Sequence, residues 1–399
     1  MPRPASILAL TTACALRLSA QQPAPPAQPG PGPGPAAPED QEKLKALEER
    51  VRKLEADAAA REAAPAPARI GGAEGSASKA LNPDLSVIGN LVASAGRDPV
   101  RPSQGLDLHE AEVALGAVVD PYSRGDVILS FGDGGAAVEE AYLTFNALPG
   151  GFTAKAGKLR AAFGKVNPAH THNLTWTDRP LVTENLLGGE EGIADAGLSV
   201  SRILPAPGSL FLEATGEVYR GTSGELFEAR RKKDVTAVGH LKAYQDLTEN
   251  TNLEVGLSYA RGHNPAGEGL VTSLRGLDAT LRWKPLLRSI YTSLMWRTEV
   301  VWSRREDLDG ARGAKGFYSS LDYRLDRRWT FGARVDRSER AEAPDRVDKG
   351  QSLLGTFWLS EFSQLRGQLK ATRYAGGAKG SEFRLQLVFL MGAHGAHPF

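Results

Sequence analysis

The residues best suited to chemistry lie in one long polar segment, residues 160–192. His170 and His172 form an H-x-H pair there, and paired imidazoles bind a transition metal when a third ligand such as a carboxylate is held beside them. The sequence identifies no such ligand, so we expect these histidines to serve in loop packing or hydrogen bonding. We predict neither a metal nor a cofactor. His394 and His397 form a second pair with the same shortcoming.

Nucleophilic catalysis needs a nucleophile, a base and an orienting acid that are brought together. The serines and histidines of this chain are scattered, and no G-x-S-x-G turn occurs. The only cysteine, Cys14, lies near the N-terminus, so the sequence predicts no disulfide and no redox site. We therefore predict that the protein is not an enzyme.

The strands that must position these residues are predicted from a pattern of alternating apolar and polar side chains. This pattern recurs about sixteen times between Asp84 and Met391. In the last repeat, FRLQLVFLM, the apolar residues from Phe383 to Met391 share one face of a strand, while Arg384 and Gln386 share the other. One face suits lipid and the other water. A soluble antiparallel protein is the alternative for any single repeat. The whole series predicts an all-β fold, a transmembrane antiparallel β-barrel of about 16 strands in residues 84–399.

Seven alternate joints between the expected strands are tight and rich in Pro, Gly, Asp and Asn, whereas the other eight are mostly longer. In outer-membrane barrels the short turns and both chain ends face the periplasm. A barrel of this size encloses a water-filled lumen. Four of the strands are expected at residues 290–302, 316–325, 329–337 and 351–360.

If the apolar face of each strand points outward, the inward charges separate by sign along the chain. We expect an acidic wall in the first half and a basic wall in the second, and hence an electric field across the lumen. The alternative is that these charges merely neutralise their cross-strand neighbours. The predicted pore-lining acidic residues are Glu110, Glu112, Asp126, Glu140, Asp195, Glu213, Glu217 and Glu254; the basic ones are Arg282, Lys284, Arg297, Arg324, Arg334, Arg366, Lys370 and Arg384.

The segment from Arg160 to Gly192 is the longest joint, and loops of about thirty residues are uncommon unless they have a function. We expect it to fold inward and narrow the lumen or cover its mouth. Its candidate constriction residues are Asp178, Arg179, Glu184, Glu190 and Glu191.

The N-terminal part divides by composition. Residues 1–20 have a basic start, an apolar stretch and a small-residue cleavage site, which predict a signal peptide, with lipidation of Cys14 as the rival reading. Residues 21–38 form a Pro/Ala-rich spacer, and residues 63–83 a linker. Residues 39–62 place Leu44, Leu47, Val51 and Leu54 at alternating spacings of three and four, which predicts a short coiled-coil helix; a solvated single helix is the alternative.

The stretch GKLRAAFGKVNP, from Gly157 to Pro168, resembles a segment of the phosphate-selective porins of the O/P type. The signal peptide, the coiled coil, the sixteen strands and the terminal Phe399 resemble the plan of that family. The resemblance implies a homotrimeric channel in the outer membrane of a Gram-negative bacterium, with anion selectivity. It also implies recognition of Phe399 by the barrel-assembly machinery, although GAHGAHPF separates that residue from the last strand.

The charge pattern favours a general porin for small hydrophilic solutes over the anion or phosphate channel that the resemblance implies, because charges of both signs line the lumen. A structural anchor without an open pore is a further alternative. The expected partners are outer-membrane lipid, the other subunits of a trimer, and small hydrophilic or anionic solutes, with the N-terminal segment in the periplasm. A formal net charge of +1 points to no nucleic-acid partner.

Overall fold

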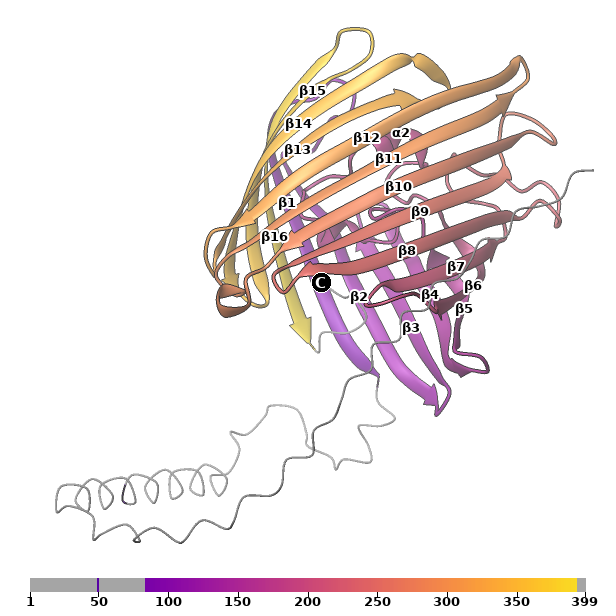
Figure 1. Cartoon of the computed structure of the whole chain (residues 1–399). Coiled ribbons are helices and arrows are strands. Elements are labelled where there is room, and N and C mark those ends of the chain that lie inside the picture. Colours follow the sequence, from indigo (N-terminus) through magenta and orange to yellow (C-terminus); the bar gives the residue numbers. More distant parts are fainter. Residues whose placement is uncertain (1–48, 50–82, 393–399) are drawn as a thin grey trace, which may run out of the picture. The chain divides into compact units, whose positions relative to one another are not determined.

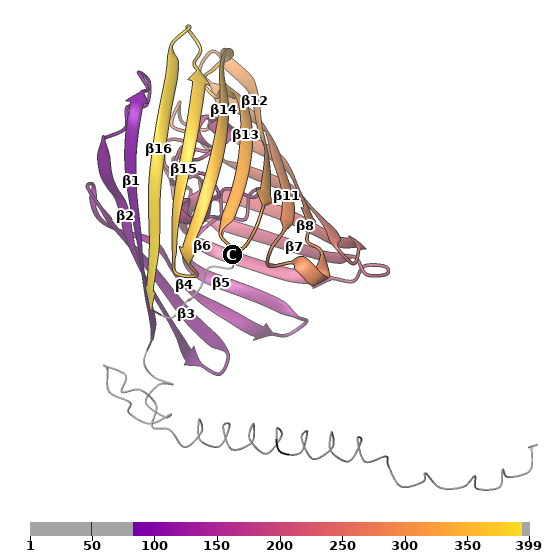
Figure 2. The same cartoon turned by 90° about the vertical axis from the view of Figure 1, so that its left-hand side faces the viewer.

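The computed structural model describes residue 49 and residues 83–392, and residues 84–392 form a closed antiparallel barrel of sixteen strands (Figure 1). Each strand pairs with its neighbours in sequence, and β1 pairs with β16 to close the sheet (Figure 2). The predicted fold class is confirmed. The strands are β1 Asp84–Arg97, β2 Leu106–Asp120, β3 Ser123–Gly132, β4 Gly135–Leu148, β5 Phe152–Arg160, β6 Ala194–Leu204, β7 Phe211–Tyr219, β8 Thr236–Thr248, β9 Thr251–His263, β10 Val271–Trp283, β11 Ser293–Asp307, β12 Gly310–Arg324, β13 Trp329–Arg340, β14 Ala343–Ser360, β15 Ser363–Arg373 and β16 Lys379–Gly392.

The alternation of side chains explains the two faces of the sheet. In β16, Phe383, Phe389 and Met391 are exposed on the outer face, whereas Gln386 is fully buried on the inner one. Leu257 and Tyr259 of β9 are likewise exposed on either side of the buried Ser258. Because side chains point alternately to the two faces of a strand, this pattern gives the barrel an apolar outside and a polar inside.

Seven short joints lie at the barrel end where β1 begins and β16 finishes, and eight joints lie at the other end. One of the seven holds the short helix η2, Leu286–Arg288. The longest joint, between β5 and β6, holds η1, Thr171–Asn173, and α2, Leu181–Leu186. Among the described residues, no helix is long and apolar enough to cross a membrane.

Three of the eight joints at the far end are two-residue turns rather than longer loops, because the flanking strands extend beyond their predicted ends. The clearest case is β14, which has 18 residues and begins at Ala343 instead of 351. Its added part is charged on both faces and includes the Arg340 partner Asp348. About ten residues suffice to cross a bilayer, so charge on both faces marks a strand that continues into water, and not a loop.

Two β-bulges lie beside the glutamates of β2 and β4. In β2, Asn90 lies opposite Glu110 and Leu91 lies opposite Leu108, so His109 is the extra residue. In β4, the partners of Ile128 and Leu129 are Glu140 and Val138, so Glu139 is the extra residue. A bulge breaks the alternation of side chains locally and re-aims them.

The predicted segments 1–20 and 21–38 lie outside the described residues, as do the coiled coil at 39–62 except for Glu49, and the linker at 63–83 except for its last residue. His394, His397 and Phe399 also lie outside them. The predictions made for these parts stay predictions.

Candidate functional site

The joint between β5 and β6, residues 161–193, is called the long loop below, and it packs against the inner face of the barrel. Helix α2 contacts β11, β12, β13 and β14 and lies behind β11 and β12 in Figure 1. Trp176 of the loop packs edge-on against Tyr318 of β12, with ring centroids 5.1 Å apart. The shared apolar core includes Phe163, Val166, Leu174, Val182, Leu186 and Leu187 from the loop, and Val238, Ala260, Leu274, Val301, Ala314 and Leu354 from the strands.

The start of the long loop is held by side chains of the wall. The backbone N–H of Gly164 donates to Ser258 Oγ at 2.9 Å, and the N–H groups of Lys165 and Val166 donate to Glu299 Oε2. Gly164 has φ +61°, and a Cβ there would overlap the Glu299 carboxylate, so the site requires glycine. This glycine belongs to the GKLRAAFGKVNP stretch.

Asn167 ties the two ends of the long loop together. Its Nδ2 donates to the carbonyl oxygens of Ala161 and Ile193 at 2.9 and 3.0 Å, and its Oδ1 accepts from the N–H of Ile193 at 2.7 Å. These three hydrogen bonds matter because a buried polar group that is left unpaired costs about 1–3 kcal/mol. Asn167 therefore fixes where the loop leaves the wall and where it returns.

On one side, the loop histidines meet four glutamates, a set that we call the acidic contact: His170 and His172 with Glu110 and Glu112 of β2 and Glu139 and Glu140 of β4. His170 Nδ1 lies 3.0 Å from Glu112 Oε2 and 3.0 Å from Glu139 Oε2, and its Nε2 lies 3.1 Å from Glu140 Oε2. The bulge explains how the consecutive residues Glu139 and Glu140 both reach one imidazole.

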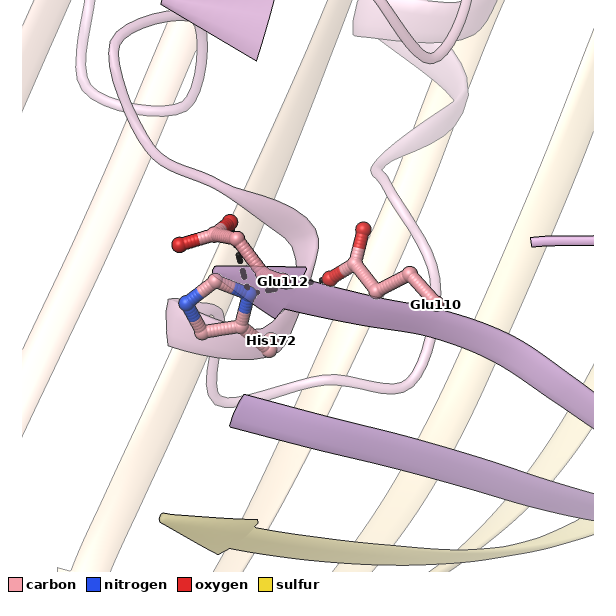
Figure 3. Close-up of side chains that lie close together, drawn as sticks. All are labelled: Glu110, Glu112 and His172. Atoms are coloured by element: carbon pink, nitrogen blue, oxygen red, sulfur yellow. Dashed lines mark hydrogen bonds and ion pairs between the residues drawn. The ribbon is translucent and has the colours of Figure 1, made fainter. Parts of the chain in front are cut away.

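His172 extends the acidic contact along β2 to Glu110, which is nearer the start of the strand than Glu112. Its Nδ1 lies 2.9 Å from Glu110 Oε1 and 3.5 Å from Glu112 Oε2 (Figure 3). The His172 and Glu112 side chains are 2% and 0% exposed, whereas Glu110 is 12% exposed. Glu112 thus contacts both histidines, and of Glu110, Glu112 and His172 it is Glu110 that solvent reaches.

Burial and the glutamates act in opposite directions on His170. Burial alone lowers the pKa of its imidazole, but the hydrogen bonds to Glu112, Glu139 and Glu140 favour the charged form and raise the pKa to about 11. In the absence of another cation, His170 is thus protonated at neutral pH and binds the loop to the acidic wall.

On the opposite side of the loop, Asp178 meets the basic wall, a set that we call the basic contact: Asp178 with Arg334 of β13 and Gln368 and Lys370 of β15. Asp178 Oδ1 lies 3.0 Å from Arg334 Nη2 and accepts from Gln368 Nε2 at 2.7 Å, while Oδ2 lies 2.8 Å from Lys370 Nζ. Burial opposes ionisation of Asp178, but Arg334, Lys370 and Arg384 outweigh it and hold the pKa of this carboxyl well below its usual range.

The remaining predicted constriction residues lie along the loop in separate places. Arg179 donates to the carbonyl oxygens of Val166 and Ala169, and burial lowers its pKa to about 10. Glu184 lies 3.6 Å from Arg101. Glu190 bonds to His109, and the Glu191 carbonyl accepts from Arg160. Of the five predicted constriction residues, Asp178 and Arg179 are therefore the least exposed.

The structure brings together some of the predicted wall charges and separates others. Glu217 accepts from the Ala162 N–H, and Glu254 pairs with Lys165. These two therefore help to hold the loop, together with the three glutamates of the acidic contact that the sequence predicted, Glu110, Glu112 and Glu140. Six of the other predicted residues pair with a nearby charge: Asp126 with Arg124, Asp195 with Arg220, Glu213 with Lys242, Arg282 with Glu254, Arg297 with Asp322 and Arg384 with Glu382. Arg366 bonds to Gln386 of the wall and to the Trp176 carbonyl of the loop. Arg324 lies at the end of β12, and Lys284 is exposed just after β10.

Sequence reasoning missed Glu139, because simple alternation assigns it to the lipid face. Two consecutive glutamates inside an expected strand are the signal for a bulge, since one of them would otherwise face lipid at a cost. It also missed Asn167 and Lys165, whose roles depend on a loop path that alternation does not predict.

The chain was compared with protein families, with curated proteins and with solved structures. No family model matches it. An uncharacterized protein of Aquifex aeolicus (strain VF5) is 31% identical over 341 residues, which cover 74% of this chain and 70% of the relative.

Similar solved structures are outer-membrane proteins. The anion-selective porin from Comamonas acidovorans has a TM-score of 0.53 at 12% identity, covering 77% of this chain and 98% of that one. OmpT of Vibrio cholerae, in its trimer form, has a TM-score of 0.53 at 10% identity, covering 78% and 99%. Pseudomonas putida OprB has a TM-score of 0.52 at 11% identity, covering 78% and 94%. These likenesses show the fold, and the resemblance to the phosphate-selective O/P type stays a prediction.

Proposed function

The chain belongs to one family with the uncharacterized Aquifex aeolicus protein, and we propose that it is an outer-membrane porin through which small hydrophilic solutes diffuse passively. The observation that carries this proposal is a closed barrel of sixteen strands with a long loop bound inside it. A barrel of this size is too wide to be filled by its own wall side chains. The inserted loop then decides how much of the lumen is open.

The charges of the wall and of the loop favour mixed selectivity. The acidic contact is on β2 and β4, and the basic contact is on β13 and β15. Since these strands flank the β1–β16 seam on its two sides, opposite charges face the loop from different arcs of the wall. A polar solute that passes the loop meets both signs of charge, which orients dipoles and favours no single ion strongly.

Strict phosphate or anion selection has less support. An anion filter needs cations that are free to replace the hydration shell of the ion. Arg334, Arg366 and Lys370 are 2%, 4% and 7% exposed and are bonded to Asp178, to Gln386 and to the loop backbone. These side chains hold the loop in place, and little of their charge remains for a passing anion.

Reconstitution of the purified protein in planar bilayers tests the proposal. We expect stepwise ohmic conductance, and a reversal potential in a KCl gradient that corresponds to weak selectivity for either ion. Strong anion selectivity would favour the phosphate-type channel instead. Absence of conductance from folded protein would favour a structural anchor, which is the remaining alternative.

The location and the assembly are part of the same proposal. An apolar outer face suits outer-membrane lipid, with the seven short joints and both chain ends toward the periplasm. A homotrimer is consistent with the trimer form of the Vibrio cholerae protein. The coiled coil predicted at residues 39–62 would support that assembly from the periplasmic side.

A further inference from the structure

We propose that Glu110, Glu112 and His172 bind a divalent transition-metal ion of the zinc type, at the point where the long loop meets the wall. The three residues come from β2 and from η1, which are separated in sequence by about sixty residues. One ligand atom from each lies within 4.8 Å of the others. The proposal rests on the packing of the loop against β2 and does not depend on whether the barrel conducts.

The distances fit a small ion. Zinc binds imidazole nitrogen and carboxylate oxygen at about 2.0–2.2 Å, so neighbouring ligands of a tetrahedral site lie about 3.3 Å apart. His172 Nδ1 is 2.9 Å from Glu110 Oε1 and 3.5 Å from Glu112 Oε2. In Figure 3 the two carboxylates point toward the same edge of the imidazole ring. Small side-chain rotations would place all three ligands around one ion.

The backbone on both partners holds the ligands in place. Glu110 and Glu112 are two residues apart in β2, so they share one face of the strand. The bulge at His109 begins directly beside Glu110, and bulges are frequent next to functional sites because they re-aim side chains. His172 is the middle residue of η1, whose position is fixed by the buried core of the loop.

The number of carboxylates around the proposed site favours a bound cation. The acidic contact contains four carboxylates, and Arg160 pairs with one of them, Glu139, at 2.9 Å. His170 contacts Glu139 and Glu140, and it also lies 3.0 Å from Glu112. A dication bound between Glu110 and Glu112 would offset the negative charge of these two carboxylates.

The ligand types select the class of ion. One imidazole with two carboxylates suits zinc, manganese or ferrous iron, and a buried imidazole disfavours magnesium and calcium, which prefer oxygen ligands alone. Glu110 is the partly exposed member of the group, so an ion can enter from its side and keep one position for water. Three protein ligands and a water is the arrangement of an accessible zinc site.

Zinc binding by the purified full-length protein tests the proposal. The reference protein carries His394→Asn and His397→Asn, because that second histidine pair would add background binding. We expect one Zn²⁺ per chain by titration against a chromophoric chelator. His172→Asn and Glu110→Gln should each weaken this binding by about 10–100-fold or more. The matched control is His263→Asn, which removes a half-buried histidine 3.9 Å from Asp234 and should leave binding unchanged.

Two results would overturn the proposal: no Zn²⁺ bound by the folded reference protein, or equal binding by the reference and the His172→Asn variant. Unheated electrophoretic mobility checks that each variant folds. A measurement without variants covers the case in which they do not: X-ray absorption of the zinc-loaded reference protein should show one imidazole among mostly oxygen ligands. A spectrum with two or more imidazoles would contradict the ligand set.

Discussion

The long loop is held at its two sides by opposite chemistry. At the basic contact, Asp178 meets Arg334 and Lys370, whose charges persist over the whole physiological pH range. At the acidic contact, the loop offers two imidazoles to four glutamates, and an imidazole can hold a proton or bind a metal ion. The comparison teaches that one side is a permanent attachment between fixed charges, whereas the other joins carboxylates to groups that can also bind a metal ion.

Breaking the basic contact should have the largest effect. Asp178→Ala leaves Arg334 buried with one of its two carboxylate partners removed, and breaking a buried ion pair costs about 3–5 kcal/mol. We expect a lower midpoint of urea unfolding, measured by tryptophan fluorescence. We also expect faster proteolysis within residues 161–193, measured by mass spectrometry. The control is Asp309→Ala, whose side chain is 87% exposed in its pair with Arg312. Equal behaviour of the two variants would show that Asp178 does not hold the loop.

Breaking the acidic contact should lower the free energy of unfolding by a smaller amount, because the glutamates that remain can still bind protons. His170→Asn removes the imidazole that meets Glu112, Glu139 and Glu140, with an expected loss of about 1–3 kcal/mol. The matched control, His263→Asn, removes a half-buried histidine that lies 3.9 Å from Asp234. The same unfolding measurement applies. A loss larger than that of Asp178→Ala would reverse the order of the two contacts.

The smallest expected effect is a change with pH in the stability that Asp178 contributes at the basic contact. The folded pKa of Asp178 lies below its unfolded value of about 3.9, so its stabilisation is complete above that value and is lost as the pH falls toward the folded pKa. The difference in stability between the wild type and Asp178→Asn should therefore be constant from about pH 7 to pH 5 and shrink below about pH 4. Shrinkage already between pH 7 and pH 5 would contradict a permanent attachment.

The fold was predictable because one physical rule, the alternation of side chains on a strand, acts in every repeat. It located the β16 strand from Phe383, Gln386 and Met391 without any knowledge of neighbours. The strand ends were not predictable in the same way. The start of β14 is charged on both faces, which the alternation assigns to a loop, although backbone pairing continues through it.

The site was only partly predictable for a related reason. Sequence reasoning named His170, His172, Glu110 and Glu112 separately, and it lacked the third ligand that would have joined them. That information lies in the path of the loop, which depends on apolar packing of Trp176 and on Asn167 bonds to both loop ends. The bulge that turns Glu139 toward His170 is likewise a local exception to the rule that identified the strands.

The attachment of the long loop to late strands has a consequence for the order of folding. Thr177 bonds to Gln368, 191 residues further along the chain, and Asp178 bonds to the same residue and to Lys370. Neighbouring strands pair through contacts that are local in sequence, whereas these contacts join residues that are far apart along the chain and require β15 to be in place. Seating of the loop therefore joins distant parts of the chain, as does the pairing of β1 with β16 that closes the barrel.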